Sequence, residues 1–319
     1  MIWSINTMSK TILVTDSLFI FKEHEDALRK AGYTIERLDK PEATEEELIK
    51  AVKGKIGYIL GGVEKITDKV IAAADELKAI AFTGSDWKAF IPGHESATKK
   101  GVAISNTPGA NSYSVAEMAM TFMFAMNRNI FELGRTGSKK FQTMHSLDEL
   151  TVGIIGMGHV GSILAKNVKN LGAKRVIYYS RTRKPDVEKD GVEYVEMNKL
   201  LSQSDVVFLL VPKSLGSDFL GAKELKLMKD GALLINIGSR ALVNKDALFA
   251  ELQTGRLRAA QEGRADERFD VLPLSVWFNT NESAAYNTVG ANRTASDMAV
   301  KSILNLLKDG KDEYKVTSA

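Results

Sequence analysis

The sequence predicts an α/β protein with parallel sheets, and three features of the chain support that prediction. Short apolar segments of strand length alternate with segments of helical pattern. One of the apolar segments runs directly into a glycine-rich turn and then a helix. The chain has 319 residues, 44% of them hydrophobic, which favours about two domains, each with its own core.

The first predicted block is one α/β unit. Helices are predicted over residues 22–31, which have a polar face, and over residues 45–52, which begin with acidic residues. Strands are predicted over residues 11–15, 56–60, 79–82 and 102–105.

A helix rich in Met, Ala and Phe is predicted after this block, from Ser114 to about Leu133. Pro108 and Gly109 mark a turn before it, and the spacing of Ser114 and Glu117 is that of a capping box. A helix that is apolar nearly all round must be buried. We interpret it as an element between two domains and at a subunit interface, although an ordinary core helix fits its composition equally well.

The second predicted block starts at about Leu150 and contains the glycine-rich turn. An amphipathic helix over residues 295–308 is predicted near the end of the chain. Strands of the second block are predicted over residues 152–155, 175–179, 206–211 and 233–237.

The glycine-rich turn has the pattern expected of a dinucleotide site. Gly156, Gly158 and Gly161 stand in the order Gly-x-Gly-x-x-Gly between a strand and a helix. The first glycine permits the tight turn, the second lets backbone approach phosphate, and the third lets the helix pack on the strand. The helix N-terminus adds N–H donors, and His159 stands there, either against phosphate or in water. A chance glycine-rich turn is the competing interpretation.

The residues after the next strand indicate which dinucleotide binds. An NAD site usually has Asp or Glu about twenty residues past the glycine loop, where it accepts from the ribose 2′-hydroxyl. Here Ser180 stands in that place, followed by Arg181, Thr182 and Arg183. A hydroxyl and guanidinium groups bind a 2′-phosphate, which a carboxylate would repel. NADP(H) is therefore the predicted cofactor, and NAD(H) is the alternative if both arginines are only solvated.

Composition and charge argue against several other classes. The 43 basic and 40 acidic residues are interspersed, so nucleic-acid binding is not indicated. The chain has no Cys, which excludes disulfides and thiolate sites, and its four His have no metal-ligand spacing. No apolar run reaches the roughly 20 residues of a membrane span. The first eight residues do not resemble a signal peptide, so we expect a soluble cytoplasmic protein without a metal.

Several segments together resemble the D-isomer-specific 2-hydroxyacid dehydrogenase family, from about residue 10 to about residue 257 and again in the last helix. The variant Ser180–Arg183 is similar to the NADP(H)-preferring glyoxylate and hydroxypyruvate reductases of that family. The resembling segments are residues 106–109, 114–117 and 127–129 for its interdomain segment, 152–161 for its nucleotide loop, and 211–212, 224–232 and 234–243 for its later cofactor-domain motifs.

The resemblance implies two Rossmann-like parallel-sheet domains with an interdomain cleft, and usually a homodimer. The substrate-binding domain would be residues 1–108 plus 293–319, and the dinucleotide-binding domain residues 109–292. The resemblance also assigns further residues to the cofactor site: Val160, Val211, Pro212, Ile237 and Glu262.

The resemblance implies a small 2-oxo or 2-hydroxy acid as substrate. Its carboxylate would be held by the loop Gly84, Ser85 and Asp86 and by Arg240. The planar fork of an Arg can clamp a carboxylate and polarise the adjacent carbonyl. A structural ion pair is the competing interpretation of Arg240.

The sequence departs from the family in its acid–base residues. The family uses a His that protonates the developing alkoxide and a Glu that orients this His. The place of the His falls on Val289, and no His follows residue 159. The place of the Glu falls near Arg268, with Glu267 adjacent. The family's Asp that faces the nicotinamide amide falls on Gly263, or on Glu262 with a shift of one residue.

Three interpretations follow from these departures. In the favoured one the protein is a reductase with non-standard acid–base machinery, because losing a general acid typically costs about 10²–10⁴-fold and need not abolish the reaction. In the second it is a dinucleotide-binding regulatory protein with little or no turnover. In the third the pocket is rebuilt, and more apolar, around Trp277, Phe278 and Tyr286. Candidate proton donors in the first are Tyr286, Lys88, His94 and Glu267.

Overall fold

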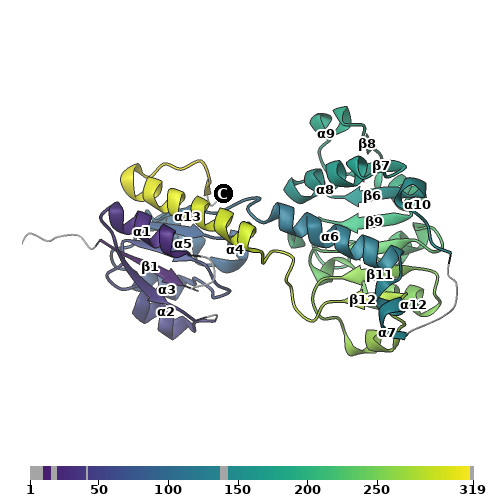
Figure 1. Ribbon diagram of the computed structural model, residues 1–319. Helices are drawn as coiled ribbons and strands as arrows, with labels where there is room; N and C mark the ends of the chain where they lie inside the picture. Colours follow the sequence, from purple (N-terminus) through teal and green to yellow (C-terminus); the bar gives the residue numbers. More distant parts are fainter. Residues whose placement is uncertain (1–9, 16–19, 41, 137–142, 317–319) are drawn as a thin grey trace, which may run out of the picture. The chain divides into compact units, whose positions relative to one another are not determined.

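The computed structural model describes residues 10–15, 20–40, 42–136 and 143–316, so the first eight residues lie outside the described part. The chain forms two compact units, which Figure 1 shows in sequence colours. Unit 1 comprises Met1–Asn111 and Thr288–Ala319, and unit 2 comprises Ser112–Asn287. The expected boundaries, 108/109 and 292/293, lie a few residues away from these.

In the described residues of unit 1, a six-stranded sheet has the order β13-β5-β4-β3-β1-β2. Its pairs are parallel except for the edge strand β13, which runs antiparallel to β5. The strands are β1 (Thr11–Thr15), β2 (Thr34–Leu38), β3 (Gly57–Leu60), β4 (Ala79–Phe82), β5 (Ala103–Ser105) and β13 (Lys315–Val316). The helices are α1 (Lys22–Lys30), α2 (Glu45–Ala51), α3 (Asp68–Ala73), α4 (Trp87–Phe90), α5 (His94–Lys99) and α13 (Val289–Asp309).

Both faces of this sheet are covered by helices. Because side chains alternate along a strand, Ile12 and Val14 of β1 pack under α1 and α13, while Leu13 packs against the opposite layer with α2, α3 and α5. Figure 1 shows α1 and α13 on one side of the sheet and α2 and α3 on the other. Burial on both faces is why β1, β3, β4 and β5 are nearly continuous apolar runs, which made them predictable. The edge strand β2, with the sequence Thr-Ile-Glu-Arg-Leu, is at least partly exposed along its whole length and was not predicted.

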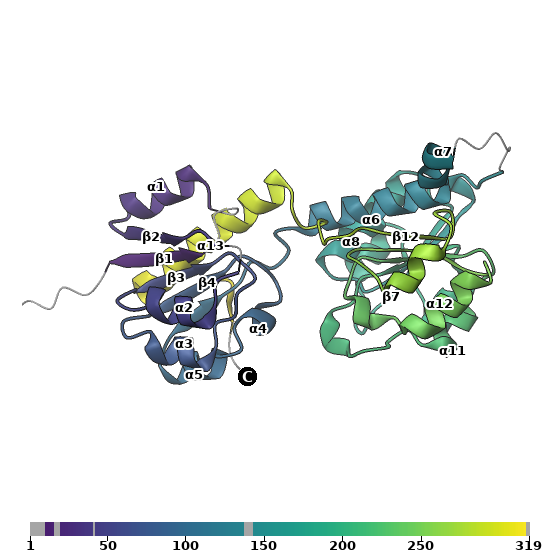
Figure 2. The ribbon, with the colours of Figure 1, turned by 90° about the horizontal axis from the view of Figure 1, so that it is seen from below.

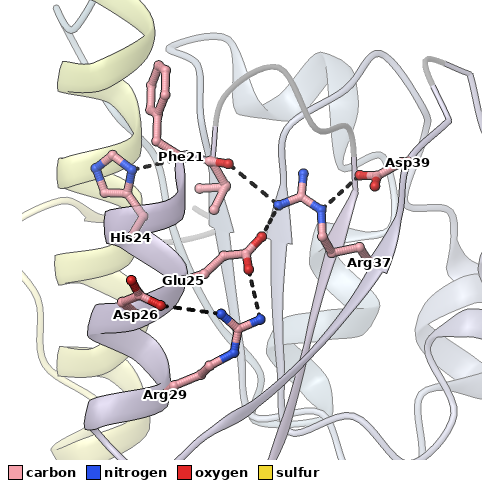
Figure 3. Close-up of polar contacts among 8 residues, drawn as sticks. Phe21, His24, Glu25, Asp26, Arg29, Arg37 and Asp39 are labelled. Carbon is pink, nitrogen blue, oxygen red and sulfur yellow. Dashed lines mark hydrogen bonds and ion pairs between the residues drawn. The ribbon is translucent and has the colours of Figure 1, made fainter.

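An ion-pair network fastens α1 to β2 (Figure 3). Glu25 accepts from Arg29 Nη2 at 2.8 Å and also from Arg37, whose Nε donates to Asp39 at 2.9 Å. Burial by itself would raise the pKa of Glu25. The hydrogen bonds from Arg37 and Arg29 outweigh that effect, and the pKa lies below its usual value.

In the described residues of unit 2, a seven-stranded parallel sheet has the order β12-β11-β10-β9-β6-β7-β8. The strands are β6 (Thr151–Ile155), β7 (Arg175–Tyr179), β8 (Glu193–Tyr194), β9 (Val206–Leu209), β10 (Leu233–Asn236), β11 (Arg258–Gln261) and β12 (Trp277–Asn279). The α-helices are α6 (Ser112–Asn127), α7 (Ile130–Thr136), α8 (His159–Asn170), α9 (Pro185–Lys189), α10 (Met197–Gln203), α11 (Ala222–Leu227) and α12 (Lys245–Gln253). Four 3₁₀ turns complete the described part: η1 (Leu147–Glu149), η2 (Lys213–Leu215), η3 (Arg240–Leu242) and η4 (Glu267–Val271).

Two helical layers enclose this second sheet, and Figure 2 shows α6 and α8 on one side and α11 and α12 on the other. Phe122 and Met126 of α6 pack with Leu164 of α8 against one face, and α10, α11 and α12 bury apolar side chains against the other. The predicted α/β class, with two parallel-sheet domains, is therefore confirmed. Among the described helices, none is long and apolar enough to cross a bilayer.

The long helix predicted from Ser114 to about Leu133 is wrong, because the structure has two helices there. The chain turns between α6 and α7 at Asn129, whose φ is 49°. The predicted capping box is also wrong. α6 starts at Ser112, so Ser114 lies inside the helix, and its hydroxyl donates to the carbonyl of Ala285 at 2.5 Å.

The last helix begins earlier than predicted. Thr288 is its N-cap, with a hydroxyl that accepts from the Ala291 N–H at 3.2 Å, and Gly310 ends the helix at a φ of 72°. The apolar pattern shows only from Ala295 on, because the first turn exposes Val289 and Gly290. A helix with exposed apolar residues at its start is not found from periodicity alone.

Candidate cofactor site

The strand order of unit 2 creates a crevice beside the glycine loop. β6 lies between β7 and β9, so the chain leaves β6 toward one edge of the sheet and continues from β9 toward the other. The loops after β6 and β9 therefore diverge at the carboxyl ends of their strands, which is where open α/β sheets bind ligands. A cavity of about 430 Å³ lies here, between the glycine loop, the end of β7 and the loop after β9.

A different observation explains why each position of the loop is occupied by glycine. Gly156 has a φ of 105°, and a Cβ there would lie 2.6 Å from the carbonyl oxygen of Leu210 on the neighbouring loop. A Cβ on Gly161 would overlap the carbonyl oxygen of Gly156. A Cβ on Gly158 would meet no described atom within 4 Å, so this residue borders open space. The first and third glycines are thus required by packing, and the second leaves room for a phosphate to approach backbone.

Helix α8 begins in this space. Gly158 is its N-cap and His159 its first residue, and the side chain of His159 is exposed. The first N–H groups of a helix have no acceptor within the helix and carry the positive end of its dipole. The loop therefore fits the pyrophosphate of a dinucleotide on the geometry of this chain.

The end of β7 lines the same cavity with polar groups. Ser180 Oγ donates to the carbonyl of Thr182 at 2.6 Å, which closes a tight turn. Arg181 and Lys184 both line the cavity, and in the described part of the chain neither the guanidinium of Arg181 nor the ammonium of Lys184 has a partner. Lys184 was not among the predicted residues, although it directly follows the segment that was.

Arg183 does not share this position with Arg181. Its guanidinium is held by Glu188, with Nε 3.1 Å from Oε1 and Nη2 2.5 Å from Oε2, and it lies over the ring of Tyr194. Of the two arginines, Arg181 lines the cavity, while Arg183 is paired with Glu188 and is not part of the lining. Much of the apolar lining comes from the segment after β9. Val211 and Pro212 were predicted, and Leu215 and Phe219 are two residues that the sequence did not single out.

Three residues predicted to contact the cofactor are not part of this lining, and two of them, Ile237 and Glu262, are buried. Ile237 is buried in the core, and Val160 packs against the same core. Glu262 is only 9% exposed, and its Oε1 accepts from the N–H groups of Ala284 at 2.7 Å and Ala285 at 2.5 Å. In this structure Glu262 fastens the segment after β12.

Arg240 lines a second cavity of unit 2, of about 470 Å³. It is the first residue of η3, and its Nη1 donates to the carbonyl of Arg264. Lys245 and Asp266 line this cavity as well, 3.4 Å apart. The guanidinium is exposed, and among the described residues only one of its five N–H groups has a partner, so the others can bind an anion.

The acid–base candidates of unit 2 are not gathered around Arg240. Glu267 is 88% exposed and lies 4.0 Å from Arg264. Arg268 pairs with Asp246 at 2.5 Å, so it has a structural partner.

The aromatic residues after β11 divide between the two faces of the sheet. Trp277 is 4% exposed, lines the cavity of Arg240 and donates from Nε1 to Asn279 at 3.0 Å. Phe278 stacks on Phe131 of α7, with ring centroids 3.8 Å apart. The expectation that Phe278 makes a substrate pocket more apolar is wrong, because successive strand residues point to opposite faces.

In unit 1 the loop after β4 is held in a fixed shape. Asn106 Nδ2 donates to the carbonyl of Ser85 at 3.0 Å, and the N–H of Thr107 donates to Gly84 at 3.1 Å. A Cβ on Gly84 would lie 2.7 Å from the ring of Phe82. A larger residue at this position would have to displace the Phe82 ring, and Ser85 and Asp86 stay exposed beside it.

The remaining candidates of unit 1 lie near α4 and at the start of α13. His94 packs edge-on against Trp87 at 5.2 Å, and Lys88 lies over the same indole at 5.5 Å. Val289 is 71% exposed at the first position of α13. Its side chain has no proton to exchange.

Comparison with known proteins also indicates a dinucleotide-binding domain in this part of the chain. The family model described as "D-isomer specific 2-hydroxyacid dehydrogenase, NAD binding domain" matches residues 120–262, which include every residue of the 430 Å³ cavity. A glyoxylate reductase of Thermococcus onnurineus is 34% identical over 236 residues, which is 70% of this chain and 70% of that protein.

Other relatives are matched over less of their length. A glyoxylate reductase of Thermococcus litoralis is 36% identical over 62% of this chain and 63% of its own length. A D-3-phosphoglycerate dehydrogenase of Methanocaldococcus jannaschii is 32% identical over 78% of this chain but only 48% of its own length. Among solved structures, the TT0316 protein from Thermus thermophilus has a TM-score of 0.83 and 26% identity over 96% of this chain and all of that one.

Proposed function

The chain belongs to the D-isomer specific 2-hydroxyacid dehydrogenase family, and on that premise we propose that it is an NADP(H)-dependent oxidoreductase of 2-hydroxy and 2-oxo acids. The observation that carries the cofactor choice is the end of β7. There Arg181 and Lys184 line the cavity, and no described residue of its lining is a carboxylate. When bound, the nicotinamide supplies the hydride that is exchanged with the carbonyl carbon.

The residues of unit 2 bind the cofactor in three parts. The glycine loop and the N-terminus of α8 bind the pyrophosphate. Val211, Pro212 and Phe219 provide the apolar surface for the adenine ring. Arg181 donates to the 2′-phosphate, and because charge-assisted hydrogen bonds are the strong ones, NADPH binds at least about tenfold more tightly than NADH.

Arg240 binds the substrate carboxylate in this proposal. Its hydrogen bond to the carbonyl of Arg264 fixes one side of the fork, and the remaining N–H groups stay available. A guanidinium held in this way can bind two oxygens at once, and can stabilise negative charge on an adjacent carbonyl oxygen. The parts assigned to Gly84, Ser85 and Asp86 in substrate binding remain predictions from the sequence.

The proton for the reduced carbonyl oxygen comes from a group other than residue 289. Glu267 is our candidate, because it shares a loop with Arg264, whose carbonyl holds Arg240. Because Glu267 is exposed, we expect slow catalysis. The rate should be about 10²–10⁴-fold below that of an enzyme with a positioned general acid. A homodimer and a cytoplasmic location also remain predictions from the sequence.

A dinucleotide-binding regulatory protein is the second candidate, and Val289 is the observation that favours it. The two functions are separated by mixing the purified protein with NADPH and a panel of 2-oxo acids, including glyoxylate, hydroxypyruvate and aromatic ones. Consumption of NADPH that is lost in Arg240→Ala is the result expected of the enzyme. Tight NADPH binding without consumption on any member of the panel is the result expected of the regulator.

A further inference from the structure

Three cationic residues lie within four positions of the turn after β7, and their side chains have different surroundings. Arg181 and Lys184 line the cofactor cavity, while Arg183 is turned to Glu188 and Tyr194. Neighbouring cations repel one another. The three side chains therefore keep their different directions only if the backbone of the turn is fixed.

Tyr178 is the residue that fixes it. This side chain is fully buried in the core of unit 2, yet its hydroxyl accepts from the backbone N–H of Lys184 at 2.6 Å. The same hydroxyl donates to Glu188 Oε1 at 2.7 Å. A single buried oxygen of β7 thus fastens the last residue of the turn, Lys184, and helix α9 through Glu188.

Glu188 completes the anchor. Its carboxylate accepts from both Arg183 and Tyr178, and these hydrogen bonds hold the pKa of Glu188 below its usual value, so the group stays ionised. Arg183 also lies 5.2 Å from the ring centroid of Tyr194, which packs edge-on against Tyr178. These contacts hold the guanidinium of Arg183 next to Glu188.

The result is a cavity edge with two cations and no described acid in its lining. Lys184 is the N-cap of α9, and Pro185 follows at the first helical position, where it needs no hydrogen-bond acceptor. The backbone of Lys184 is thus fixed, while its ammonium stays available beside Arg181. Two cations at one edge suit a group with two negative charges better than a neutral hydroxyl does.

We propose that Lys184 is a second ligand of the cofactor's 2′-phosphate, and that Tyr178, anchored by Glu188, is a positioning residue that aims Lys184 and Arg181 at it. This inference rests on the proposed function. Lys184 is then a specificity-determining residue that acts through its ammonium. Tyr178 acts through its buried hydroxyl, which fixes the backbone of the turn.

The test compares dissociation constants for NADPH and NADH by titration of the whole protein. In Lys184→Gln, NADPH binding is expected to weaken by about tenfold, with NADH binding unchanged, because one charge-assisted contact is lost. In Tyr178→Phe the ring and its packing remain, and the preference for NADPH is expected to narrow in the same way. A merely structural role for Tyr178 would weaken the binding of both cofactors alike.

Glu193→Gln serves as the matched control. It removes a similar pair, with Arg175 Nη2 2.6 Å from Glu193 Oε2, outside the cavity lining, and it is expected to leave both constants unchanged. If the wild type prefers NADPH and Arg181→Ala narrows the preference, but Lys184→Gln does not, the phosphate contact of Lys184 is overturned while the proposed function stands. If Tyr178→Phe leaves the preference unchanged, its positioning role is overturned. If the wild type has no preference for NADPH, both the proposed function and this inference are overturned.

Discussion

Arg183 Nη2 lies 2.5 Å from Glu188 Oε2, and this pair removes one of two closely spaced arginines from the cofactor cavity. Arg181 lies two residues earlier on the same turn and lines the cavity. The two residues are of the same type and stand in the same short segment, so their roles differ only through what surrounds them.

Arg181→Ala and Arg183→Ala are therefore expected to behave differently. Arg181→Ala removes a phosphate ligand, so it should weaken NADPH binding by about tenfold or more and leave NADH binding unchanged. Arg183→Ala should alter the preference much less, because its guanidinium is already paired. Dissociation constants from cofactor titrations measure both effects, and equal losses of preference in the two variants would refute this division of roles.

Arg240→Lys is expected to lower kcat/KM for a 2-oxo acid by about 10²-fold or more, because an ammonium cannot reproduce a planar two-oxygen clamp. Arg264→Ala is the matched control, since the acceptor for Arg240 is the backbone carbonyl of residue 264 and survives the substitution. Initial rates at several substrate concentrations separate the effects on kcat and KM. Full activity in Arg240→Lys would contradict this prediction, because it would show that a single positive charge is enough to bind the substrate carboxylate.

Glu262→Ala distinguishes an anchoring role from a cofactor role. The buried carboxylate accepts two backbone N–H groups, and leaving them unpaired should cost about 1.5–3 kcal/mol of the free energy of unfolding. For a unit of this size each kcal/mol lowers Tm by about 2–4 °C. Calorimetry should show this loss. Weaker cofactor binding at unchanged Tm would instead restore the role predicted from the sequence.

The network around Glu25 predicts a pH dependence of stability. The pKa of Glu25 is lowered in the folded protein, so its contribution is fully present above the unfolded value, near 4.5, and is lost as pH falls through the folded pKa. The wild type should therefore be more stable than Glu25→Gln near neutral pH, and the difference should shrink below about pH 4.5. Thermal unfolding at several pH values measures it. Asp26→Asn is the control, because Asp26 is exposed and lies 3.5 Å from Arg29. A difference that does not change with pH would contradict this assignment.

The central strands of both sheets could be predicted because they are buried on both faces, whereas the edge strand β2 is at least partly exposed along its whole length and was not predicted. The strands at residues 11–15, 79–82 and 175–179 have the bounds that their apolar runs indicate. The break at Asn129 was not predictable in the same way. Apolar residues resume directly after it, with Ile130, Phe131 and Leu133, so the apolar spacing does not reveal the turn that Asn129 makes at a φ of 49°.

The candidate site was predictable as far as local sequence controls it. The glycine spacing locates the loop, and one of its constraints is local, because a Cβ on Gly161 would overlap the carbonyl oxygen of Gly156. Partners distant in the chain were not predictable from spacing. Glu262 reaches Ala284 and Ala285, and Phe278 faces Phe131, through the order of strands in the sheet.

The most direct test of the central claim is the pair of dissociation constants for NADPH and NADH, measured on the wild-type protein in one buffer, first at low and then at high ionic strength. NADPH is expected to bind at least about tenfold more tightly, and the gap is expected to narrow as salt screens Arg181 and Lys184. Equal binding of the two cofactors, or tighter binding of NADH, would contradict the claim.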